Sequence, residues 1–437
     1  MKKILALFLI SLIALSSCKN SEESSNSEEP VELVFYGLYD AEEIYTPLIQ
    51  KFQLEHSNVS INYKKFSSEQ DYYELILNEL AEGEGPDIFL LGNTELYEQR
   101  GKIVPAPSEL LETEVFRSYY ADSVSEAIIW PDDLGAERIW SLPLYVDTLA
   151  LIFNSTLIAS PSSQWEELTR QVEELVEADK SFERFSQAGI SMGRFDNIQR
   201  GFDVVLHLIA QANTAIFTED YAAALVADNP DLVSAILFFT SFAEPNEGHY
   251  SWNEFLADPN SSEKELTPFA RGKVAMIFGY SYTFQLVVDE INRLNSLNQE
   301  TISIEELKVG YLPQTAEPIY FARFLSPVVS RTSEHPDEAW NFLAFLSEEE
   351  NLSWYHQQTH KPSPSKTLLN EQKDEPIYGI FAEQAASSLH PKIIYEKKVK
   401  DLFTKAIADI LDNKSPTEVL NILDNEIENL ITNAQTQ

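Results

Sequence analysis

The chain has 437 residues, with 31 lysines and arginines against 70 aspartates and glutamates, so its formal net charge at pH 7 is −39. A body this acidic is repelled by phosphate backbones and by anionic lipid headgroups, which excludes nucleic acid as a partner. The single cysteine excludes an intramolecular disulfide, and the length exceeds the about 250 to 300 residues at which one core stops growing, so we expect two lobes.

Residues 1–17 have the layout of an export signal. Two lysines precede the apolar run Ile4 to Leu15, which is shorter than the about 20 residues that a membrane-spanning helix needs. The segment Leu15-Ser16-Ser17-Cys18 resembles a bacterial lipobox, which implies that residues 1–17 are removed and that Cys18 is lipidated. An ordinary signal peptide followed by an unmodified cysteine is the alternative.

Residues 18–30 predict a disordered tether, because serine, glutamate and asparagine dominate them and cannot bury enough surface to offset the entropy of ordering. We therefore expect an exported protein that meets the cell membrane only through a lipid anchor and faces the periplasm or the cell exterior.

Strand and helix patterns alternate through the first part of the mature chain. Strand-like runs at 31–37, 60–66 and 87–92 alternate with helical spacing of apolar residues at 42–56 and 70–81. This alternation predicts a mostly parallel sheet with helices on its faces. A second strand-rich cluster covers 139–146 and 149–154.

The remaining chain is mainly helical, interrupted by a few strands. Helices are predicted at 165–178, 201–213, 231–242, 336–347, 349–358, 395–411 and 416–432, and strands at 273–279, 308–312 and 326–330. The pattern predicts an α/β fold of two lobes, each a mixed, mostly parallel sheet flanked by helices, with hinge crossings and a helical C-terminal region. We assign 31–142 plus 270–325 to lobe 1 and 143–269 plus 326–437 to lobe 2.

Six short segments, in the same order as in one known family, extend over nearly the whole mature chain. They are Gly85-Pro86-Asp87-Ile88, Gly101-Lys102-Ile103-Val104-Pro105, Leu142-Pro143 with the apolar strand ending at Asn154, Trp165-Glu166-Glu167-Leu168, Phe269 to Met276, and His335 to Leu346. Together they resemble the carbohydrate-type extracellular solute-binding proteins of ABC importers, the maltose-binding-protein-like family.

This resemblance implies a periplasmic-binding-protein-like fold that captures a small polar solute, a mono- or oligosaccharide, by hinge closure and delivers it to an ABC transporter permease. We expect a monomer that is not an enzyme and that holds no cofactor or metal. Two segments depart from the family. Residues 320–324 are bulky and basic where relatives are glycine-rich, and residues 279–282 read Gly-Tyr-Ser-Tyr where many relatives have Gly-Ser-Trp. The identity of the sugar is therefore not carried over.

Ligands of open α/β sheets bind beyond the carboxyl ends of the strands, in the crevice between two lobes. A sugar needs a flat aromatic face and polar groups that match its hydroxyls. Candidates are the aromatic and polar residues that follow the predicted strands, one tryptophan in a polar loop, and one arginine. They are Tyr36, Tyr39, Asp40, Asn93, Tyr145, Asp147, Trp252, Tyr280, Ser281, Tyr282 and Arg323.

Each candidate tyrosine has the alternative of packing inside the protein. Arg323 has two interpretations: it binds a carboxylate or sulfate on the ligand, or it forms an ion pair within the protein. Trp140, Trp165 and Trp340 are predicted core residues because of their periodicity.

Two other functions stay open at this stage, a binding protein for a non-sugar solute (peptide, polyamine or chelate) and a surface glycosidase. The sequence has no Gly-x-Ser-x-Gly elbow and no phosphate-binding glycine loop. His356 and His360 are one helical turn apart, but Gln357 stands where a zinc protease has its glutamate, and Pro362 is close enough to end the helix. No metal site is predicted there.

Overall fold

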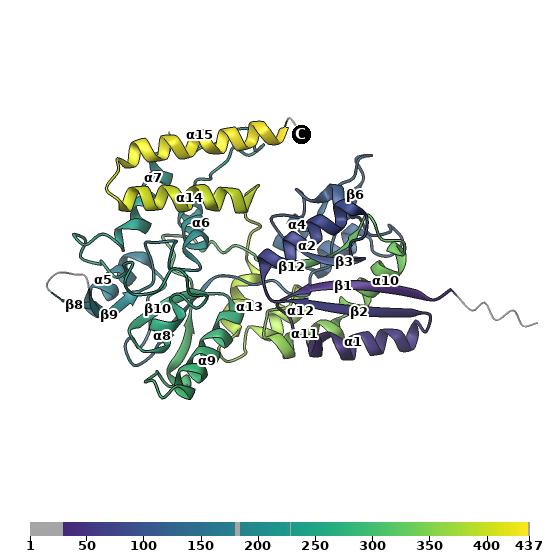
Figure 1. The fold of residues 1–437 in the computed structure, drawn as a ribbon, viewed down its shortest axis with the longest axis horizontal. Coiled ribbons are helices and arrows are strands. Elements are labelled where there is room, and N and C mark those ends of the chain that lie inside the picture. Colours follow the sequence, from purple (N-terminus) through teal and green to yellow (C-terminus); the bar gives the residue numbers. More distant parts are fainter. Residues whose placement is uncertain (1–28, 180–183, 228, 436–437) are drawn as a thin grey trace, which may run out of the picture.

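The computed structural model describes residues 29–179, 184–227 and 229–435. The predicted export signal, Cys18 and the tether up to residue 28 lie outside the described residues. The described chain forms two lobes, each built around a five-stranded sheet, and Figure 1 shows them side by side. Within these ranges, no helix combines the length and the apolar character needed to cross a membrane.

The sheet of the first lobe has the strand order β2-β1-β3-β12-β4. Its strands run in one direction except β12, which is antiparallel to both β3 and β4. Its strands are β1 (Val31–Leu38), β2 (Val59–Phe66), β3 (Ile88–Gly92), β4 (Ile103–Val104) and β12 (Leu325–Ser330), with a separate hairpin of β5 (Ile129–Pro131) and β6 (Glu137–Ile139). Its helices are α1 (Glu42–Glu55), α2 (Glu69–Glu82), α3 (Thr113–Tyr119), α4 (Asp122–Ile128), α10 (Pro336–Leu346), α11 (Glu349–Thr359), α12 (Lys366–Gln372), α13 (Gly379–Ala386) and the 3-10 turn η1 (Arg100–Lys102).

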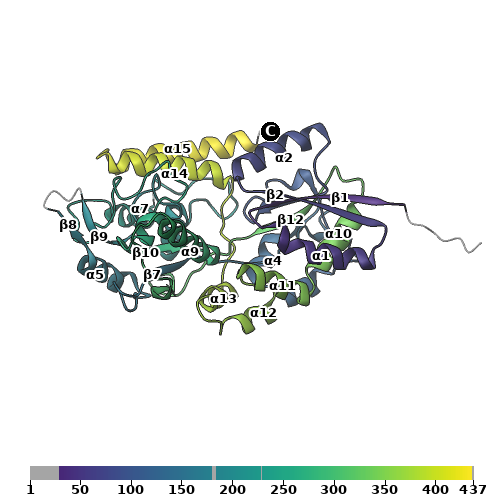
Figure 2. The same cartoon turned by 60° about the horizontal axis from the view of Figure 1, so that its bottom comes forward.

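The sheet of the second lobe has the order β11-β7-β10-β9-β8 and is also mixed, with β10 parallel to β9 and antiparallel to β7. Its strands are β7 (Ala150–Asn154), β8 (Glu177–Ala178), β9 (Phe185–Ile190), β10 (Val274–Gly279) and β11 (Leu307–Gly310). Its helices are α5 (Trp165–Leu175), α6 (Gly201–Gln211), α7 (Pro230–Ser241), α8 (Leu266–Ala270), α9 (Ser281–Ser296), α14 (Glu396–Leu411), α15 (Pro416–Gln435) and the 3-10 turn η2 (Ile304–Glu306). Figures 1 and 2 both show α14 and α15 packed along this lobe.

Most predicted elements agree with the structure within a few residues, and two do not. The predicted strand at 139–146 is wrong: β6 ends at Ile139, and the following residues are irregular because they lead out of the first lobe. The helix predicted at 165–178 ends at Leu175, and residues 177–178 form β8 instead.

The predicted division of the second half of the chain between the lobes is also wrong. We assigned 270–325 to lobe 1, but β10 pairs with β7 and β9 in the second lobe. We assigned 326–437 to lobe 2, but β12 pairs with β3 and β4, and α10 to α13 pack into the first core. Both strands are buried on both faces, so no alternation of buried and exposed residues says which sheet they join.

The apolar cores separate at the same places as the sheets. The first cluster includes residues up to Val146 and resumes at Ala322, whereas the second begins at Leu149 and includes Tyr320. The three tryptophans predicted as core, Trp140, Trp165 and Trp340, are all buried, which confirms that prediction. The second lobe holds a further cluster between Ile152 and Leu307. The chain therefore passes between the core of the first lobe and those of the second at 146–149, near 321, and again between 386 and 393.

A glycine fixes the loop that leads from β9 to α6. At Gly193 the backbone φ is 106°, and a Cβ atom would lie 2.7 Å from the backbone nitrogen of Ala243. We predict that Gly193→Ala lowers the free energy of unfolding by about 2 to 4 kcal/mol, through strain and overpacking. Gly101→Ala is the control, since its Cβ would meet no atom within 4 Å. Equal urea-unfolding midpoints for the two variants would contradict this geometry.

Candidate functional site

Three chain segments cross between the lobes and run side by side. In the first two, the Asp147 N–H donates to the Arg323 carbonyl at 2.9 Å, and the Arg323 N–H donates to the Asp147 carbonyl at 2.8 Å. In the second and third, the Ala322 N–H donates to the Leu389 carbonyl at 2.9 Å, and the Leu389 N–H donates to the Tyr320 carbonyl at 2.8 Å. The crossings therefore form one short hydrogen-bonded ladder, which we call the crossing ladder.

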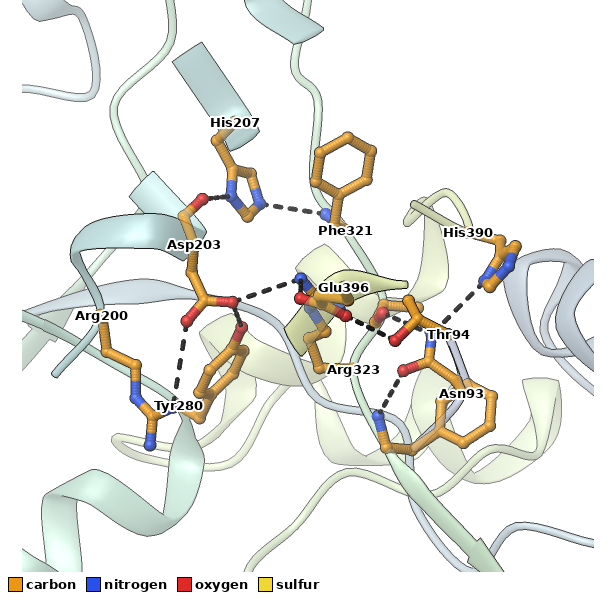
Figure 3. A network of polar contacts seen from close by, with 12 residues as sticks. Asn93, Thr94, Arg200, Asp203, His207, Tyr280, Phe321, Arg323, His390 and Glu396 are labelled. Atoms are coloured by element: carbon orange, nitrogen blue, oxygen red, sulfur yellow. Dashed lines mark hydrogen bonds and ion pairs between the residues drawn. The ribbon is translucent and has the colours of Figure 1, made fainter. Parts of the chain in front are cut away.

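The side chain of Arg323 ties the crossing ladder to its surroundings (Figure 3). Its Nη1 and Nη2 donate to the two carboxylate oxygens of Glu396, the first residue of α14, at 2.7 and 2.6 Å. Nη2 also lies 3.4 Å from Oδ1 of Asp203 in α6. Burial by itself would lower the pKa of Arg323, but Glu396, Tyr280 and Asp203 raise it, so the guanidinium stays charged. Of the two interpretations of Arg323, the ion pair within the protein is the one observed.

Asn93 and Thr94, which follow β3, attach the first lobe to this network. The Asn93 Nδ2 donates to the Ala322 carbonyl at 3.0 Å, and the Phe324 N–H donates to Asn93 Oδ1 at 3.4 Å. The Thr94 hydroxyl donates to Oε2 of Glu396 at 2.5 Å. Asn93, which we predicted to contact the ligand, therefore uses its side-chain amide to bind the backbone of the second crossing segment.

Asp147 attaches the crossing ladder to the second lobe. Its carboxylate accepts hydrogen bonds from the Ser281 N–H at 3.0 Å and the Ser281 hydroxyl at 2.6 Å, so it caps the N-terminus of α9. The side chain is only 1% exposed, and burial raises the pKa of Asp147 to about 6 although the bonds from Ser281 oppose this. The hydrogen bonds between Asp147 and Ser281 therefore connect the crossing ladder to the N-terminus of α9.

A second buried ion pair lies in the first lobe. The Lys361 Nζ is 2.6 Å from Oδ1 of Asp40, and the Tyr355 hydroxyl donates to Oδ2 of Asp40 at 2.5 Å. The same ammonium lies over the ring of Tyr145, 4.6 Å from its centroid, and Tyr145 stacks on Tyr355. A carboxylate withdrawn from water requires such compensation, so Asp40 is neutralised inside the protein.

Tyr39 differs from the other candidates because half of it, 50%, is exposed. It follows β1, and its backbone φ of 72° is one that side-chain-bearing residues adopt at a cost of roughly 1 to 2 kcal/mol. Burial and Glu69, whose carboxylate accepts its hydroxyl at 3.4 Å, raise the pKa of Tyr39 to about 12. Tyr282 and Arg200, from the other lobe, also act on that pKa. The two lobes face each other at these residues.

The facing surface of the second lobe is aromatic and charged. The Arg200 Nη2 donates to the Tyr282 hydroxyl at 2.5 Å, and the Tyr280 hydroxyl donates to Oδ1 of Asp203 at 3.0 Å. The rings of Tyr280 and Tyr282 are stacked with centroids 5.9 Å apart. Burial would raise the pKa of Asp203, but Arg323 and Arg200 hold it below its ordinary value.

His207, also in α6, connects this surface to the second crossing (Figure 3). Its Nδ1 lies 2.7 Å from the Asp203 carbonyl, and its Nε2 accepts the Phe321 N–H at 3.1 Å. Because Nε2 is an acceptor, the ring is neutral with its proton on Nδ1. Burial lowers the pKa of His207 to about 4.

The structure brings most of the predicted site residues around the crossing ladder and the two facing surfaces. These are Tyr39, Asp40, Asn93, Tyr145, Asp147, Tyr280, Ser281, Tyr282 and Arg323. Tyr36 lies elsewhere, beneath α2, where its hydroxyl donates to Glu79 at 3.4 Å and Lys64 covers its ring at 4.6 Å.

The expectation that Trp252 meets the ligand is wrong. Its side chain is fully buried in the second lobe, and its Nε1 donates to Oδ1 of Asn197 at 2.9 Å. The neighbouring Ser251 hydroxyl accepts the N–H groups of Gly189 and Ile190. The polar residues around Trp252 therefore satisfy buried backbone rather than mark a surface loop.

The sequence analysis missed seven residues of the network: Thr94, Arg200, Asp203, His207, Tyr355, Lys361 and Glu396. The only local signal is that Arg200 and Asp203 are three residues apart at the start of a helix. That spacing is equally typical of a surface ion pair, and Glu396 is one acidic residue among 70 aspartates and glutamates.

Two surface pockets lie away from this network, on the first lobe. One of about 720 Å³ is bordered by Tyr97, Arg100, Trp140 and Arg331. The other, of about 600 Å³, lies between Lys366 and Lys373 of the α12 region and Glu383 of α13. Neither pocket is bordered by a residue of the crossing ladder. The candidate site is therefore defined by the side chains around the crossing ladder and not by a pocket.

A sequence model described as bacterial extracellular solute-binding protein matches residues 40–352. No curated protein matches the sequence significantly.

Several solved structures have the same fold. The sugar-binding protein MalE from Xanthomonas citri superposes with a TM-score of 0.73 at 16% identity, over 93% of this chain and 98% of that chain. The GacH receptor of Streptomyces glaucescens, solved unliganded and with acarbose, gives 0.72 at 15% identity, over 93% and 99%. A solute-binding protein from Thermotoga lettingae bound with α-D-tagatose gives 0.69 at 18% identity, over 92% and 100%. The predicted two-lobe fold is confirmed.

Removing the charge of Glu396 should loosen the junction. We predict that Glu396→Gln lowers the free energy of unfolding by about 3 kcal/mol, because Arg323 then remains buried with only the more distant Asp203. The matched control is Lys414→Gln, which breaks an ion pair of the same 2.6 Å length with Asp409 whose lysine is 56% exposed. The control should cost far less, because an exposed ion pair is screened by water and contributes little to stability. Urea unfolding, followed by fluorescence and by circular dichroism, measures both, and equal losses would contradict the assigned role.

The neutral His207 predicts a specific sensitivity to acid. Its folded-state pKa of about 4 lies below the about 6.5 of an unfolded histidine, so the unfolded chain gains a proton first as the pH falls. The stabilising contribution is complete above pH 6.5 and is lost progressively toward pH 4, by about 2 kcal/mol between pH 7 and 5. Asp147, whose pKa is raised, opposes this trend.

Comparison with His207→Gln separates the two groups. The difference in free energy of unfolding between the wild type and this variant should shrink by about 2 kcal/mol between pH 7 and pH 5, when unfolding is measured at both pH values. A difference that stays constant with pH would show that His207 is not held neutral.

Proposed function

Because the chain belongs to the bacterial extracellular solute-binding protein family, we propose that it captures a sugar between its two lobes and delivers it to the permease of an ABC transporter. The ligand is a mono- or oligosaccharide, and the lobes close on it by rotation about the crossing ladder. The protein acts as an exported monomer, held at the membrane by a lipid on Cys18, which lies outside the described residues.

The observation that carries the proposal is the pair of facing surfaces. Tyr39 of the first lobe is half exposed and within electrostatic reach of Arg200 and Tyr282 of the second, which are bonded to each other. Tyrosine rings supply a flat contact surface and lose little side-chain entropy when a ligand binds. Guanidinium and hydroxyl groups form hydrogen bonds with sugar hydroxyls. The strained backbone of Tyr39 fits a residue kept for a ligand rather than for stability.

The charges of the site favour a sugar over a polyamine. Asp40 is paired with Lys361, Glu396 with Arg323, and Asp147 caps α9. These carboxylates are engaged with protein cations and donors, whereas a polyamine site needs carboxylates that are free to bind the ligand.

The burial and the contacts of Asp147 also support the proposal that the protein is not a glycosidase. A glycosidase needs a protonated carboxyl group with a raised pKa beside the scissile bond. Asp147 has a raised pKa, but it is 1% exposed and bonded to Ser281. Release of products from oligosaccharides incubated with the protein would overturn this part of the proposal.

Binding is tested by thermal unfolding of the mature chain against sugars, polyamines and amino acids. A ligand that binds only the folded state at a hundred times its Kd adds about 2.7 kcal/mol of stability, so a sugar should raise the Tm. If only a polyamine raises it, the carbohydrate assignment is wrong.

Tyr39 gives the sharper test, because one change should move stability and affinity in opposite directions. Tyr39→Gly relieves the positive φ and should stabilise the free protein by about 1 kcal/mol. It should also weaken sugar binding about tenfold, through loss of the aromatic contact. The matched control is Tyr97→Gly, an equally exposed tyrosine of the first lobe that borders the separate pocket. Calorimetric titration checks both, and equal affinities in the two variants would remove Tyr39 from the site.

A further inference from the structure

Three cationic side chains stand around the junction of the lobes, and one of them has no close carboxylate partner among the described residues. Lys361 lies 2.6 Å from Asp40, and Arg323 lies 2.6 Å from Glu396. The nearest carboxylate to Arg200 is Asp203, at 3.9 Å. In a chain with a net charge of −39, an arginine without a close acidic partner is conspicuous.

Asp203 pairs with Arg200 only at long range, because its Oδ2 lies 3.9 Å from Nη1 of Arg200, beyond hydrogen-bond distance. Its Oδ1 accepts the Tyr280 hydroxyl at 3.0 Å and lies 3.4 Å from Nη2 of Arg323. Figure 3 shows the Asp203 carboxylate between Arg323, Tyr280 and Arg200, with a dashed line to each.

The guanidinium of Arg200 is nevertheless held in place. It lies over the rings of Tyr280 and Tyr282, at 5.1 and 5.6 Å from their centroids, and Nη2 donates to the Tyr282 hydroxyl at 2.5 Å. Its Nε–H is withdrawn from solvent and has no acceptor among the described residues. A buried donor without an acceptor carries a free-energy cost, which a bound ligand removes.

Arg200 lies at the junction of the lobes, because Tyr282, which it binds, follows Ser281, and Ser281 binds Asp147 of the crossing ladder. It acts on the pKa of Tyr39, which stands half exposed at the end of β1. An oriented guanidinium with an unsatisfied Nε–H, whose Nη1 is beyond hydrogen-bond distance of its carboxylate partner, suits a planar anion attached to a ring.

Building on the proposed function, we infer that the sugar is acidic: it carries a carboxylate, as a uronic acid does, and Arg200 binds that carboxylate. The ring of Tyr39 covers the sugar from the opposite lobe. Arg323, which the sequence suggested for this task, is occupied by Glu396. The net charge of the protein repels an anion at long range, so selectivity has to come from this local contact.

The experiment is calorimetric titration of the mature chain with an oligogalacturonate, with the neutral galactose oligomer of equal length, and with a sulfated galactose oligomer. The uronate should bind at least tenfold more tightly than either of the others. Arg200→Gln should remove that preference, and Arg200→Lys, which keeps the charge but loses the planar fork, should reduce it about tenfold.

Arg194→Gln is the matched control. Arg194 lies in the same loop and is equally shielded, with 21% side-chain exposure against 24% for Arg200, but it is paired with Asp196 and Glu254. Its loss should leave the preference unchanged, and thermal unfolding of each variant verifies that it is folded.

The outcomes separate the inference from the proposed function. Neutral sugars that bind as well as uronates, with no effect of Arg200→Gln, overturn the acidic ligand and leave sugar capture standing. Tighter binding of the sulfated oligomer overturns the carboxylate assignment. If the folded protein binds none of these sugars and none in the wider panel, the proposed function falls, and the inference falls with it.

Discussion

The compensation of one buried charge, the guanidinium of Arg323, is the constraint on which the junction of the two lobes depends. A charge largely removed from water costs several kcal/mol unless opposite charge and hydrogen bonds replace its hydration. Its partners come from separate parts of the chain, Glu396 at the start of α14 and Asp203 in α6, while its backbone pairs with Asp147. The contacts that compensate the charge of Arg323 therefore hold the crossing segments against the second lobe.

The same arrangement is compatible with the proposed movement of the lobes as units. The two apolar cores end where the crossing ladder begins, so rotation about the ladder does not require either core to be repacked. Asp147 fastens the ladder to α9 through Ser281, and Asn93 fastens it to the first lobe. A rotation at the ladder is therefore carried directly to Tyr39 on one side and to Tyr282 on the other.

Cations are scarce in this acidic chain, and the three at the junction have different tasks. Lys361 neutralises Asp40 beneath a layer of tyrosines, and Arg323 joins the crossings. Arg200 is oriented by aromatic rings and has no such pairing at close range. Lysine and arginine are not interchangeable in these positions, because only the planar guanidinium presents two parallel N–H groups to both oxygens of one carboxylate.

Apolar periodicity, a local property, predicted most helices and strands, the buried Trp165 and Trp340, and the two-lobe α/β class from the sequence alone. The strand-end rule also selected Tyr39, Asp147 and Tyr280 to Tyr282, which lie near the crossing ladder, while their contact with a ligand stays a prediction. Which sheet β10 and β12 join, the burial of Trp252, and the pairing of Arg323 with Glu396 were decided only by the tertiary structure. The physical reason is that strand pairing and charge compensation join residues far apart in the chain, and the free energy that selects each partner exists only once the surrounding surface has left water.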